Sequence, residues 1–211
     1  MVSTRTPSPL SGRRAEAARN DERILASARA VFLDDPDAPI TAVAKHAGVG
    51  ISALYTRYGS KEELLRKICK DGLQTFVAET EAALEDPRDD WTAWSDYMRR
   101  LVAADTSSMT LALAGTFTPT AEMFELAERA NGLSQRLFER VRHGLRPDLD
   151  VHDPSVVFEM VAAIKLGDRP RTERLRQRYL TIVLDGMRAG EGTELPGPPP
   201  SWSELSGRWV T

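Results

Sequence analysis

The stretch of residues 40–65, ITAVAKHAGVGISALYTRYGSKEELL, constrains the fold of this chain more than any other. Thr41 is suited to begin a helix as an N-cap, because its hydroxyl can accept a hydrogen bond from a free backbone amide of the first turn. Apolar residues follow at helical spacing, and Gly48 stands where the chain must turn, since glycine adopts a positive φ at little cost. The pattern predicts a short helix, a tight turn and a second helix over residues 51–57.

A third helix is predicted directly after this pair. Gly59 ends the second helix, and Ser60 and Glu63 have the spacing of a capping box with Ser60 as the N-cap. Apolar residues at helical spacing then continue to about residue 84. Such an arrangement is typical of a helix-turn-helix, which presents the N-terminal part of its second helix to the base edges of DNA.

The residues predicted to contact DNA lie on or beside that second helix. They are Thr41, Gly50, Ile51, Ser52, Ala53, Tyr55, Thr56, Arg57 and Lys61. Ser52 and Ala53 are small and allow the backbone to come close to DNA, whereas the two hydroxyl side chains after them can reach phosphates or bases. The two cations of the set can neutralise phosphates. The alternative is a plain helical hairpin with tyrosines in its core, but the capping, turn and periodicity signals agree with one another.

The same residues resemble the tetracycline-repressor (TetR) family of bacterial regulators, whose motif has an Ala-Gly-Val turn, a Leu-Tyr pair, an aromatic pair and Ser-Lys-Glu. The corresponding residues here are Ala47, Gly48, Val49, Leu54, Tyr55, Tyr58, Ser60, Lys61, Glu62, Glu63, Leu64 and Leu65. The preceding helix, over residues 24–32, is also similar to the family pattern. The resemblance covers about residues 20–70, and beyond them it rests on length and helical layout.

The chain departs from the family pattern at three positions of the second helix. Ile51 stands where many relatives have a basic residue, Ser52 where many have glycine, and Arg57 replaces one of the usual aromatic residues. Ile51 can contact a thymine methyl group or pack inside the domain, and both alternatives stay open. These departures leave the operator sequence undefined.

The resemblance implies an all-α fold of about nine helices, with an N-terminal three-helix DNA-binding domain and a C-terminal helical domain for ligand binding and dimerisation. The expected divisions are a basic flexible arm over residues 1–19, the helix-turn-helix domain over 20–66, the helical domain over 67–190 and a proline-rich tail over 191–211. The implied function is a transcriptional regulator, by family default a repressor. It would bind a palindromic double-stranded DNA operator as a homodimer and be released by a small apolar ligand of unknown identity.

Charge is distributed unevenly along the chain, whose formal net charge is −3. Residues 1–70 carry 12 basic and 8 acidic side chains, whereas the rest carries 16 basic and 23 acidic ones. A basic N-terminal part fits a protein that presents one face to phosphates, although chance produces such a split fairly often. Within residues 1–19, Pro7, Pro9 and Gly12 disfavour a helix, so this segment is either an arm that follows the DNA or a soluble tail.

Cysteine usage and hydropathy indicate the compartment. The single cysteine, Cys69, cannot form an internal disulfide, and its place on the helix after the motif indicates packing. No apolar stretch has the length of a signal-peptide core or of a membrane span. A cytoplasmic protein that does not contact membranes is therefore expected.

Prolines and glycines divide the remainder into further helical stretches. Thr118 and Pro119 are expected to begin one of them as N-cap and first-turn proline. The last two stretches, over residues 153–188, have wide apolar faces and are joined by a short turn. They can either close the core of the monomer or meet their copies about a two-fold axis. The resemblance favours the second arrangement, a homodimer through residues 153–188.

A ligand pocket is expected inside the C-terminal helices, because family members commonly hold one there. The candidate lining residues are bulky or flexible apolar side chains, namely Trp94, Met98, Met109, Phe117, Met123, Phe124 and Phe138. For any one of them, a place in the hydrophobic core is the simpler interpretation. The tail contains Trp202 and Trp209 in a proline-rich segment that predicts no helix, and both rings are expected to pack on the body or on a partner chain.

Enzyme chemistry finds no support in the sequence. The three histidines lack metal-ligand spacing, and neither a nucleophile elbow nor a phosphate-binding glycine loop is present, so no metal site or cofactor is expected. The alternative function is a helical dimeric module that binds a ligand or a protein and carries a vestigial DNA-binding domain. The missing basic residue at Ile51 keeps that alternative open.

Overall fold

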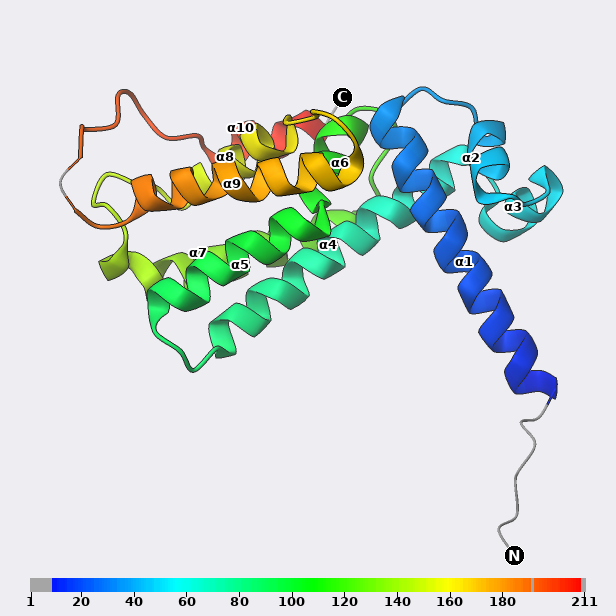
Figure 1. The fold of residues 1–211 in the computed structure, drawn as a ribbon, viewed down its shortest axis with the longest axis horizontal. Coiled ribbons are helices and arrows are strands. Elements are labelled where there is room, and N and C mark those ends of the chain that lie inside the picture. The colour runs from blue at the N-terminus through cyan, green and yellow to red at the C-terminus, as the bar shows by residue number, and fades with distance from the viewer. Residues whose placement is uncertain (1–8, 191, 210–211) are drawn as a thin grey trace, which may run out of the picture. The chain divides into compact units, whose positions relative to one another are not determined.

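The computed structural model describes residues 9–190 and 192–209, and within these ranges the chain is helical and contains no β-strand (Figure 1). The only pairing of extended backbone in the described ranges is a single bridge between Leu145 and Arg188. Contacts divide the chain into two compact units between Ile68 and Cys69, and none of the described helices is long and apolar enough to cross a membrane. The all-α prediction is confirmed.

The N-terminal unit consists of α1 (Pro9–Asp34), α2 (Ile40–Ala47), α3 (Ile51–Tyr58) and the first turns of α4 (Lys61–Glu85), which continues into the C-terminal unit. Its core is built from the apolar stripes of all four helices. The most deeply buried side chains are those of Ile24, Ala28, Phe32, Val43, Leu54, Leu64, Leu65 and Ile68. The helix-turn-helix predicted from residues 40–65 is thus formed, with its long third helix.

Two predictions for the ends of these helices are wrong. The segment from Pro9 to residue 19 is helical. Pro9 is compatible with this helix because the first residues of a helix have no intrahelical partner for their amides, so the missing N–H of proline costs nothing there. Residues 1–8 of the expected arm lie outside the described residues. Thr41 is not the N-cap of α2. The helix begins one residue earlier, at Ile40, with Pro39 as an N-cap that makes no side-chain hydrogen bond.

Over its described residues, the C-terminal unit contains the rest of α4 and six further α-helices. They are α5 (Asp90–Ala104), α6 (Thr106–Leu113), α7 (Ala121–Val141), α8 (Asp153–Ala162), α9 (Arg169–Met187) and α10 (Trp202–Ser206), with 3₁₀ turns at Arg142–Gly144 and Gly207–Trp209. The predicted start of α7 at Thr118 and Pro119 is wrong, since Thr120 is its N-cap and accepts a hydrogen bond from the Met123 amide. The tail also contains a helix, α10, where none was predicted.

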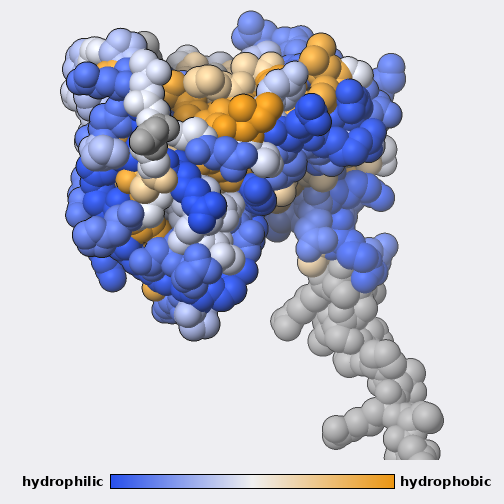
Figure 2. Space-filling model, turned by 60° about the vertical axis from the view of Figure 1, so that its left-hand side comes forward, coloured by the Kyte–Doolittle hydropathy of each residue, from blue (hydrophilic) through white to orange (hydrophobic). Residues whose placement is uncertain are grey.

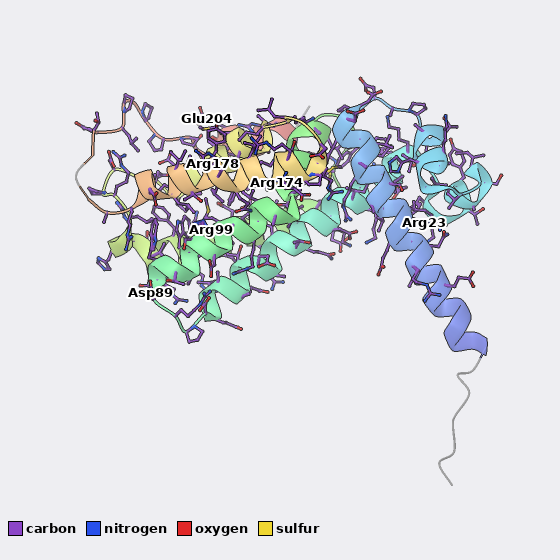
Figure 3. The ribbon with its side chains drawn as sticks, viewed as in Figure 1. Arg23, Asp89, Arg99, Arg174, Arg178 and Glu204 are labelled. Atoms are coloured by element: carbon purple, nitrogen blue, oxygen red, sulfur yellow. The ribbon has the colours of Figure 1, made fainter. Side chains whose placement is uncertain are left out.

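Local side-chain caps fix the starts of several of these helices. Asp89 accepts a hydrogen bond of 3.0 Å from the Thr92 amide at the start of α5. Ser201 and Glu204 form a complete capping box around α10 (Asp89 and Glu204 are labelled in Figure 3). Each cap satisfies backbone amides that a helix start leaves without an intrahelical partner.

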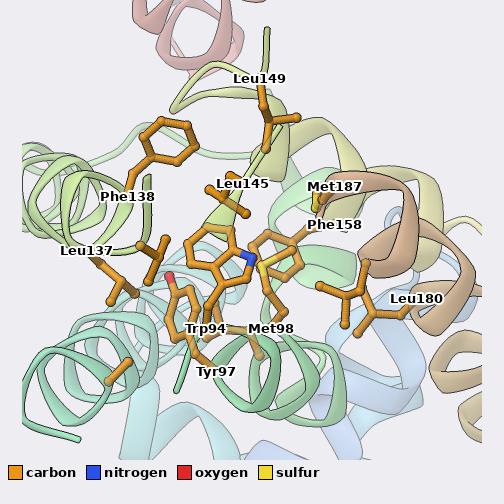
Figure 4. Close-up of a cluster of buried hydrophobic side chains, with 14 of the residues drawn as sticks. Trp94, Tyr97, Met98, Leu137, Phe138, Leu145, Leu149, Phe158, Leu180 and Met187 are labelled. Carbon is orange, nitrogen blue, oxygen red and sulfur yellow. The ribbon is translucent and has the colours of Figure 1, made fainter. Parts of the chain in front are cut away.

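The interior of the C-terminal unit is a closely packed apolar cluster contributed by α4, α5, α7, α8 and α9 (Figure 4). Trp94 and Tyr97 of α5 pack with their ring centroids 5.8 Å apart, and Phe138 of α7 meets Trp94 edge-on at 6.3 Å. The buried Tyr97 hydroxyl lies 3.1 Å from that of Thr80, which satisfies a polar group inside the cluster.

One buried arginine fastens α9 to its neighbours. Arg176 pairs with Asp105 at 2.6 Å, and it donates further hydrogen bonds to the carbonyl oxygens of Ala162 and Ile164. All three bonds use the guanidinium, so the buried charge is paired and hydrogen-bonded, as its desolvation requires. The residue therefore fixes the junction of α8 and α9 against the end of α5.

Candidate DNA-recognition surface and ligand cavity

The turn between α2 and α3 has the geometry that the sequence predicted. Gly48 adopts φ +63° and ψ 37°, in the left-handed region, and the amide of Val49 donates to the Ala44 carbonyl oxygen at 3.0 Å. Gly50 is extended and is the N-cap of α3. The αL residue closes α2 and redirects the chain within three residues.

α3 is attached to the unit by one face and exposes the other. Leu54 is completely buried, whereas Ser52, Ala53 and Thr56 are exposed and Tyr55 is 47% exposed. The Thr56 hydroxyl donates a 2.8 Å hydrogen bond to the Ser52 carbonyl oxygen, so its oxygen remains able only to accept further bonds. The exposed face combines small side chains with three hydroxyl groups, those of Ser52, Tyr55 and Thr56.

A three-residue polar cluster joins α3 to α1. Arg57 donates to both carboxylate oxygens of Asp21, at 2.9 and 3.1 Å, and the Tyr58 hydroxyl donates to the same carboxylate. The hydrogen bond from Arg57 is the main cause that lowers the pKa of Asp21, while burial and the neighbouring carboxylate raise the pKa of Tyr58. The cluster holds Asp21 ionised and fixes the C-terminal end of α3.

Lys61, at the start of α4, is also engaged within the N-terminal unit. Its ammonium lies 5.3 Å from the centroid of the Phe32 ring and donates to the Pro36 carbonyl oxygen at 3.2 Å. Directly before it, the Ser60 hydroxyl accepts the Glu63 amide at 3.0 Å, which confirms Ser60 as the N-cap. The Ser60 amide donates to Tyr58 instead of Glu63, so only half of the predicted capping box is formed.

Most of the nine residues predicted to contact DNA are on the surface. The exposed ones are Thr41, Gly50, Ser52, Ala53, Tyr55, Thr56 and Arg57, and the half-buried ones are Ile51 and Lys61. Sequence reasoning did not find Asp21, because the acid that neutralises Arg57 comes from a helix 36 residues away.

The C-terminal unit contains a cavity of about 240 Å³ among α4, α7, α8 and the tail. Its walls are mainly apolar and partly aromatic. Side chains of this kind are those of Leu73, Phe76, Met123, Phe124, Val151, Phe158, Trp202, Leu205 and Trp209. Such a composition is typical of sites for small molecules, although the volume lies just below the range of about 300–1,000 Å³ of drug-sized sites.

The cavity includes only some of the residues predicted for a ligand site. Met123 and Phe124 line it, whereas Trp94, Met98 and Phe138 belong to the packed core cluster. Met109 and Phe117 are buried without lining the cavity. Helical spacing identifies side chains that face inward, but it does not show which of them pack against others and which border a void. The contribution of Trp202 and Trp209 confirms the expectation that both rings pack on the body.

Titratable groups at the cavity do not indicate reactive chemistry. Burial raises the pKa of the Cys69 thiol to about 12, so the nucleophilic thiolate is scarcely populated near neutral pH. The side chain of His152 lies 3.1 Å from Asp150 through Nδ1.

Exposed apolar side chains concentrate on α8, α9 and the turn between them. Met160 is 59% exposed and Ile182 is 58% exposed, and Leu166 and Tyr179 are also on the surface. Figure 2 shows one face of the molecule on which apolar side chains (orange) gather among hydrophilic ones. Such a group of large apolar side chains is characteristic of an interaction surface.

Comparison with known proteins agrees with this architecture. Residues 24–68 match the model of the bacterial regulatory proteins, tetR family. No curated protein matches the sequence significantly. Among solved structures, a TetR transcriptional regulator from Streptomyces coelicolor is 24% identical with a TM-score of 0.55, and the alignment covers 81% of this chain and 99% of that chain.

Two further solved structures share the fold over a similar length. A ketosteroid transcriptional regulator of Mycobacterium tuberculosis is 18% identical, with a TM-score of 0.58 and coverage of 82% of this chain and 96% of that chain. A γ-butyrolactone receptor, described as ArpA-like, is 20% identical, with a TM-score of 0.57 and coverage of 82% and 90%. The chain therefore carries the N-terminal domain of the tetR family of bacterial regulatory proteins and has the fold of TetR-family transcriptional regulators.

Proposed function

We propose that this chain is a DNA-binding transcriptional regulator, acting as a repressor, that binds a palindromic operator through α3. The observation that carries the proposal is the exposed face of α3, on which Ser52, Ala53, Tyr55 and Thr56 project while Leu54 anchors the helix. Small side chains permit close approach to DNA, and hydroxyls suit phosphate and base contacts. The family match over residues 24–68 supports the same role.

The proposed DNA surface comprises the nine residues named from the sequence, with two roles among them. Thr41, Gly50 and the exposed face of α3 would touch DNA directly. Arg57 would hold α3 in position through Asp21, and Lys61 would hold the start of α4 through Phe32 and Pro36, because both cations already have partners inside the unit. The side chain of Arg57 is 60% exposed, so its guanidinium can still approach a phosphate from this position.

A homodimer through α8 and α9 would place two copies of α3 on one operator. The exposed apolar side chains of Met160, Leu166, Tyr179 and Ile182 support this assignment, since their burial in a two-fold interface removes apolar area from water. Two recognition helices related by a two-fold axis read a palindromic site, which accounts for the proposed operator symmetry.

A small apolar molecule bound in the 240 Å³ cavity would control DNA binding. One solved structure that shares this fold is described as a γ-butyrolactone receptor, which supports a small-molecule site in this protein too. Cys69, Gly72, Leu73 and Phe76 all line the cavity from α4, the helix that begins at Lys61 beside the DNA-binding residues. A ligand that binds more tightly to a conformation unsuited to DNA would stabilise that conformation. The free energy of DNA binding would then weaken by up to the difference between the ligand's binding free energies for the two conformations.

The alternative function, a helical dimeric ligand-binding or interaction module with a vestigial DNA-binding domain, has one specific observation in its favour. The two cations of the predicted DNA surface, Arg57 and Lys61, already have partners within the unit, and Ile51 occupies the position that is basic in many relatives. Affinity for phosphate would then be weak. Measurement of DNA binding and of its salt dependence distinguishes the two functions.

The test begins with duplexes that the purified protein selects from a random-sequence pool. Titration by fluorescence anisotropy at increasing salt should show a linear fall of log affinity with log salt, because phosphate contacts release counterions. We expect Tyr55→Ala to weaken binding about tenfold, the effect of one contact of about 1.4 kcal/mol. Gln135→Ala, which changes an exposed residue of α7, serves as the control and should bind DNA like the wild type. Failure to select any duplex, or equal affinity of both variants, would favour the alternative.

A further inference from the structure

The C-terminal segment 201–209 forms part of the wall of the cavity. Trp202, Leu205, Ser206, Arg208 and Trp209 all line it, opposite residues of α4, α7 and α8. These nine positions contribute five lining residues, as many as the nine positions 151–159. The shape of the cavity therefore depends on where this segment lies.

Side-chain contacts at three points hold the segment on the body. The Trp202 indole Nε1 donates to the Glu128 carboxylate on α7 at 2.9 Å. Arg208 forms an ion pair with Glu159 on α8, and the ring of Trp209 packs at 5.8 Å from that of Phe117. The capping box of Ser201 and Glu204 gives the segment a local structure of its own.

The contacts that hold the segment are few and partly exposed. The side chain of Arg208 is 40% exposed, and ion pairs of this kind contribute little to stability in water. The connection to α9 runs through Gly197 and four prolines, and it is fixed at its other end by the Leu195 amide, which donates to Asp148 at 2.9 Å. The segment can therefore leave the body without disturbing the packed core, in which it does not take part.

The lining chemistry defines the kind of molecule that the cavity would accept. Three charged side chains border it, Glu128, Glu159 and Arg208, and two of them form an ion pair with each other. An anion would meet the remaining carboxylate, and any charged group would lose its hydration against the apolar walls. A neutral, mainly apolar molecule avoids both penalties and can pack against the apolar walls of the cavity.

We propose that residues 201–209 are a movable wall of the ligand site, which admits a neutral apolar molecule and closes over it with Trp202 and Trp209. The inference rests on the ligand-binding part of the proposed function, and it adds residues of the tail to that site. A ligand in the closed cavity contacts both the tail and the helices, so it stabilises the docked position of the tail by mass action. A larger ligand requires the wall to shift outward.

Binding of two related fluorescent probes to the full-length protein tests the ligand class. N-phenylnaphthylamine is neutral, and anilinonaphthalene sulfonate has the same aromatic skeleton with an added anionic group. We expect the neutral probe to bind more tightly than the anionic one. Equal or tighter binding of the anion, or no binding of the neutral probe, would overturn the assignment. Operator binding measured on the same preparation reports separately on the proposed DNA function.

Tail variants test the wall itself. Trp209→Ala should weaken binding of the neutral probe about tenfold, as expected when an aromatic side chain in contact with a ligand is removed. Leu195→Ala, which changes an exposed tail residue that does not line the cavity, is the matched control and should bind like the wild type. An unchanged affinity in Trp209→Ala, with thermal unfolding like that of the wild type, would contradict the proposal.

Hydrogen exchange of the wild-type protein gives an independent measurement that requires no variant. Amides of residues 201–209 should exchange more slowly when the neutral probe is bound, because the ligand holds the segment on the body. Amides of α5, which contributes no residue to the cavity walls, should be unaffected and provide the internal control. Unchanged exchange in the tail at saturating probe would overturn the proposal.

Discussion

At the scale of single residues, Asp21 matters most for the orientation of α3. Its carboxylate accepts hydrogen bonds from Arg57 and Tyr58, the last two residues before the glycine that ends the helix. No contact of this kind follows from the family motif, in which the position of Arg57 is usually aromatic. At this position the chain instead has an ion pair between Arg57 and Asp21.

We predict that Asp21→Asn lowers the stability of the N-terminal unit by about 1 kcal/mol, a modest value because Arg57 is largely exposed. The pKa of Asp21 is lowered in the folded protein, so its contribution is complete above about pH 4 and is lost as the pH falls through the folded value. Thermal unfolding from pH 7 to pH 3 measures this effect.

Comparison with a neighbouring acid controls this prediction. Glu22→Gln changes an exposed carboxylate one position further along α1 and should leave the unfolding temperature unchanged. The difference between wild type and Asp21→Asn should shrink as the pH falls below 4. A difference that stays constant with pH would show that the ionised carboxylate is not the stabilising group.

Gly48 gives a second prediction at the same scale. Its φ of +63° is unfavourable for residues with a Cβ, whereas a Cβ built there meets no atom within 4 Å. Gly48→Ala should therefore destabilise the unit by about 1–2 kcal/mol through backbone conformation alone. Chemical denaturation measures the change, with Gly72→Ala in the helical α4 as the control that should be neutral or stabilising. Equal effects of both substitutions would contradict the conformational explanation.

At the scale of helices, α8 and α9 carry the prediction that concerns assembly. Ile182→Glu places a charge in the exposed apolar patch. Burial of that charge in a dimer interface would require its desolvation, which opposes dimerisation. We expect the wild type to sediment as a dimer and the variant as a monomer. Thr181→Glu, an exposed neighbour on α9, tests whether any charge on this helix has the same effect.

Analytical ultracentrifugation over a range of concentrations distinguishes the outcomes of that experiment. A folded monomeric Ile182→Glu beside a dimeric wild type supports the interface through α8 and α9. A wild type that is monomeric at every concentration, or a variant that dimerises as strongly as the wild type, would exclude it.

Helix boundaries illustrate what local sequence signals can establish. Gly48, Gly59 and Ser60 act at single positions, and the structure places the ends of α2 and α3 and the start of α4 where these residues predicted them. Thr118 misled the prediction for α7 because Thr120 offers the same chemistry two residues later. Pro9 misled the prediction for α1, since a proline excludes a helix interior but not a helix start.

At the scale of the whole molecule, the cavity was the least predictable feature. Its walls come from α4, α6, α7, α8, the connection between α6 and α7 and the tail, which are far apart in sequence, and a void has no periodic signal. Trp94 and Phe138 have the same inward-facing spacing as Met123, yet they fill the core while Met123 borders the cavity. The packing of all helices together decides between these two outcomes.

The all-α architecture, by contrast, was predicted because each helix has its own amphipathic stripe and its own start and stop signals. The contact that fixes α9, from Arg176 to Asp105, could not be predicted, since it joins residues 71 positions apart. Local sequence signals therefore predict the helices and their order, whereas contacts between residues far apart in the chain determine where the cavity lies.

The measurement that tests the central claim most directly is selection of genomic DNA fragments by the purified full-length protein at physiological salt, followed by sequencing. A dimer that reads DNA through two copies of α3 should enrich a short palindrome with half-sites one helical turn, or a multiple of it, apart. Tyr55→Ala should enrich the same fragments less. Enrichment of no sequence above background, or equal enrichment by both proteins, would contradict recognition of DNA through α3.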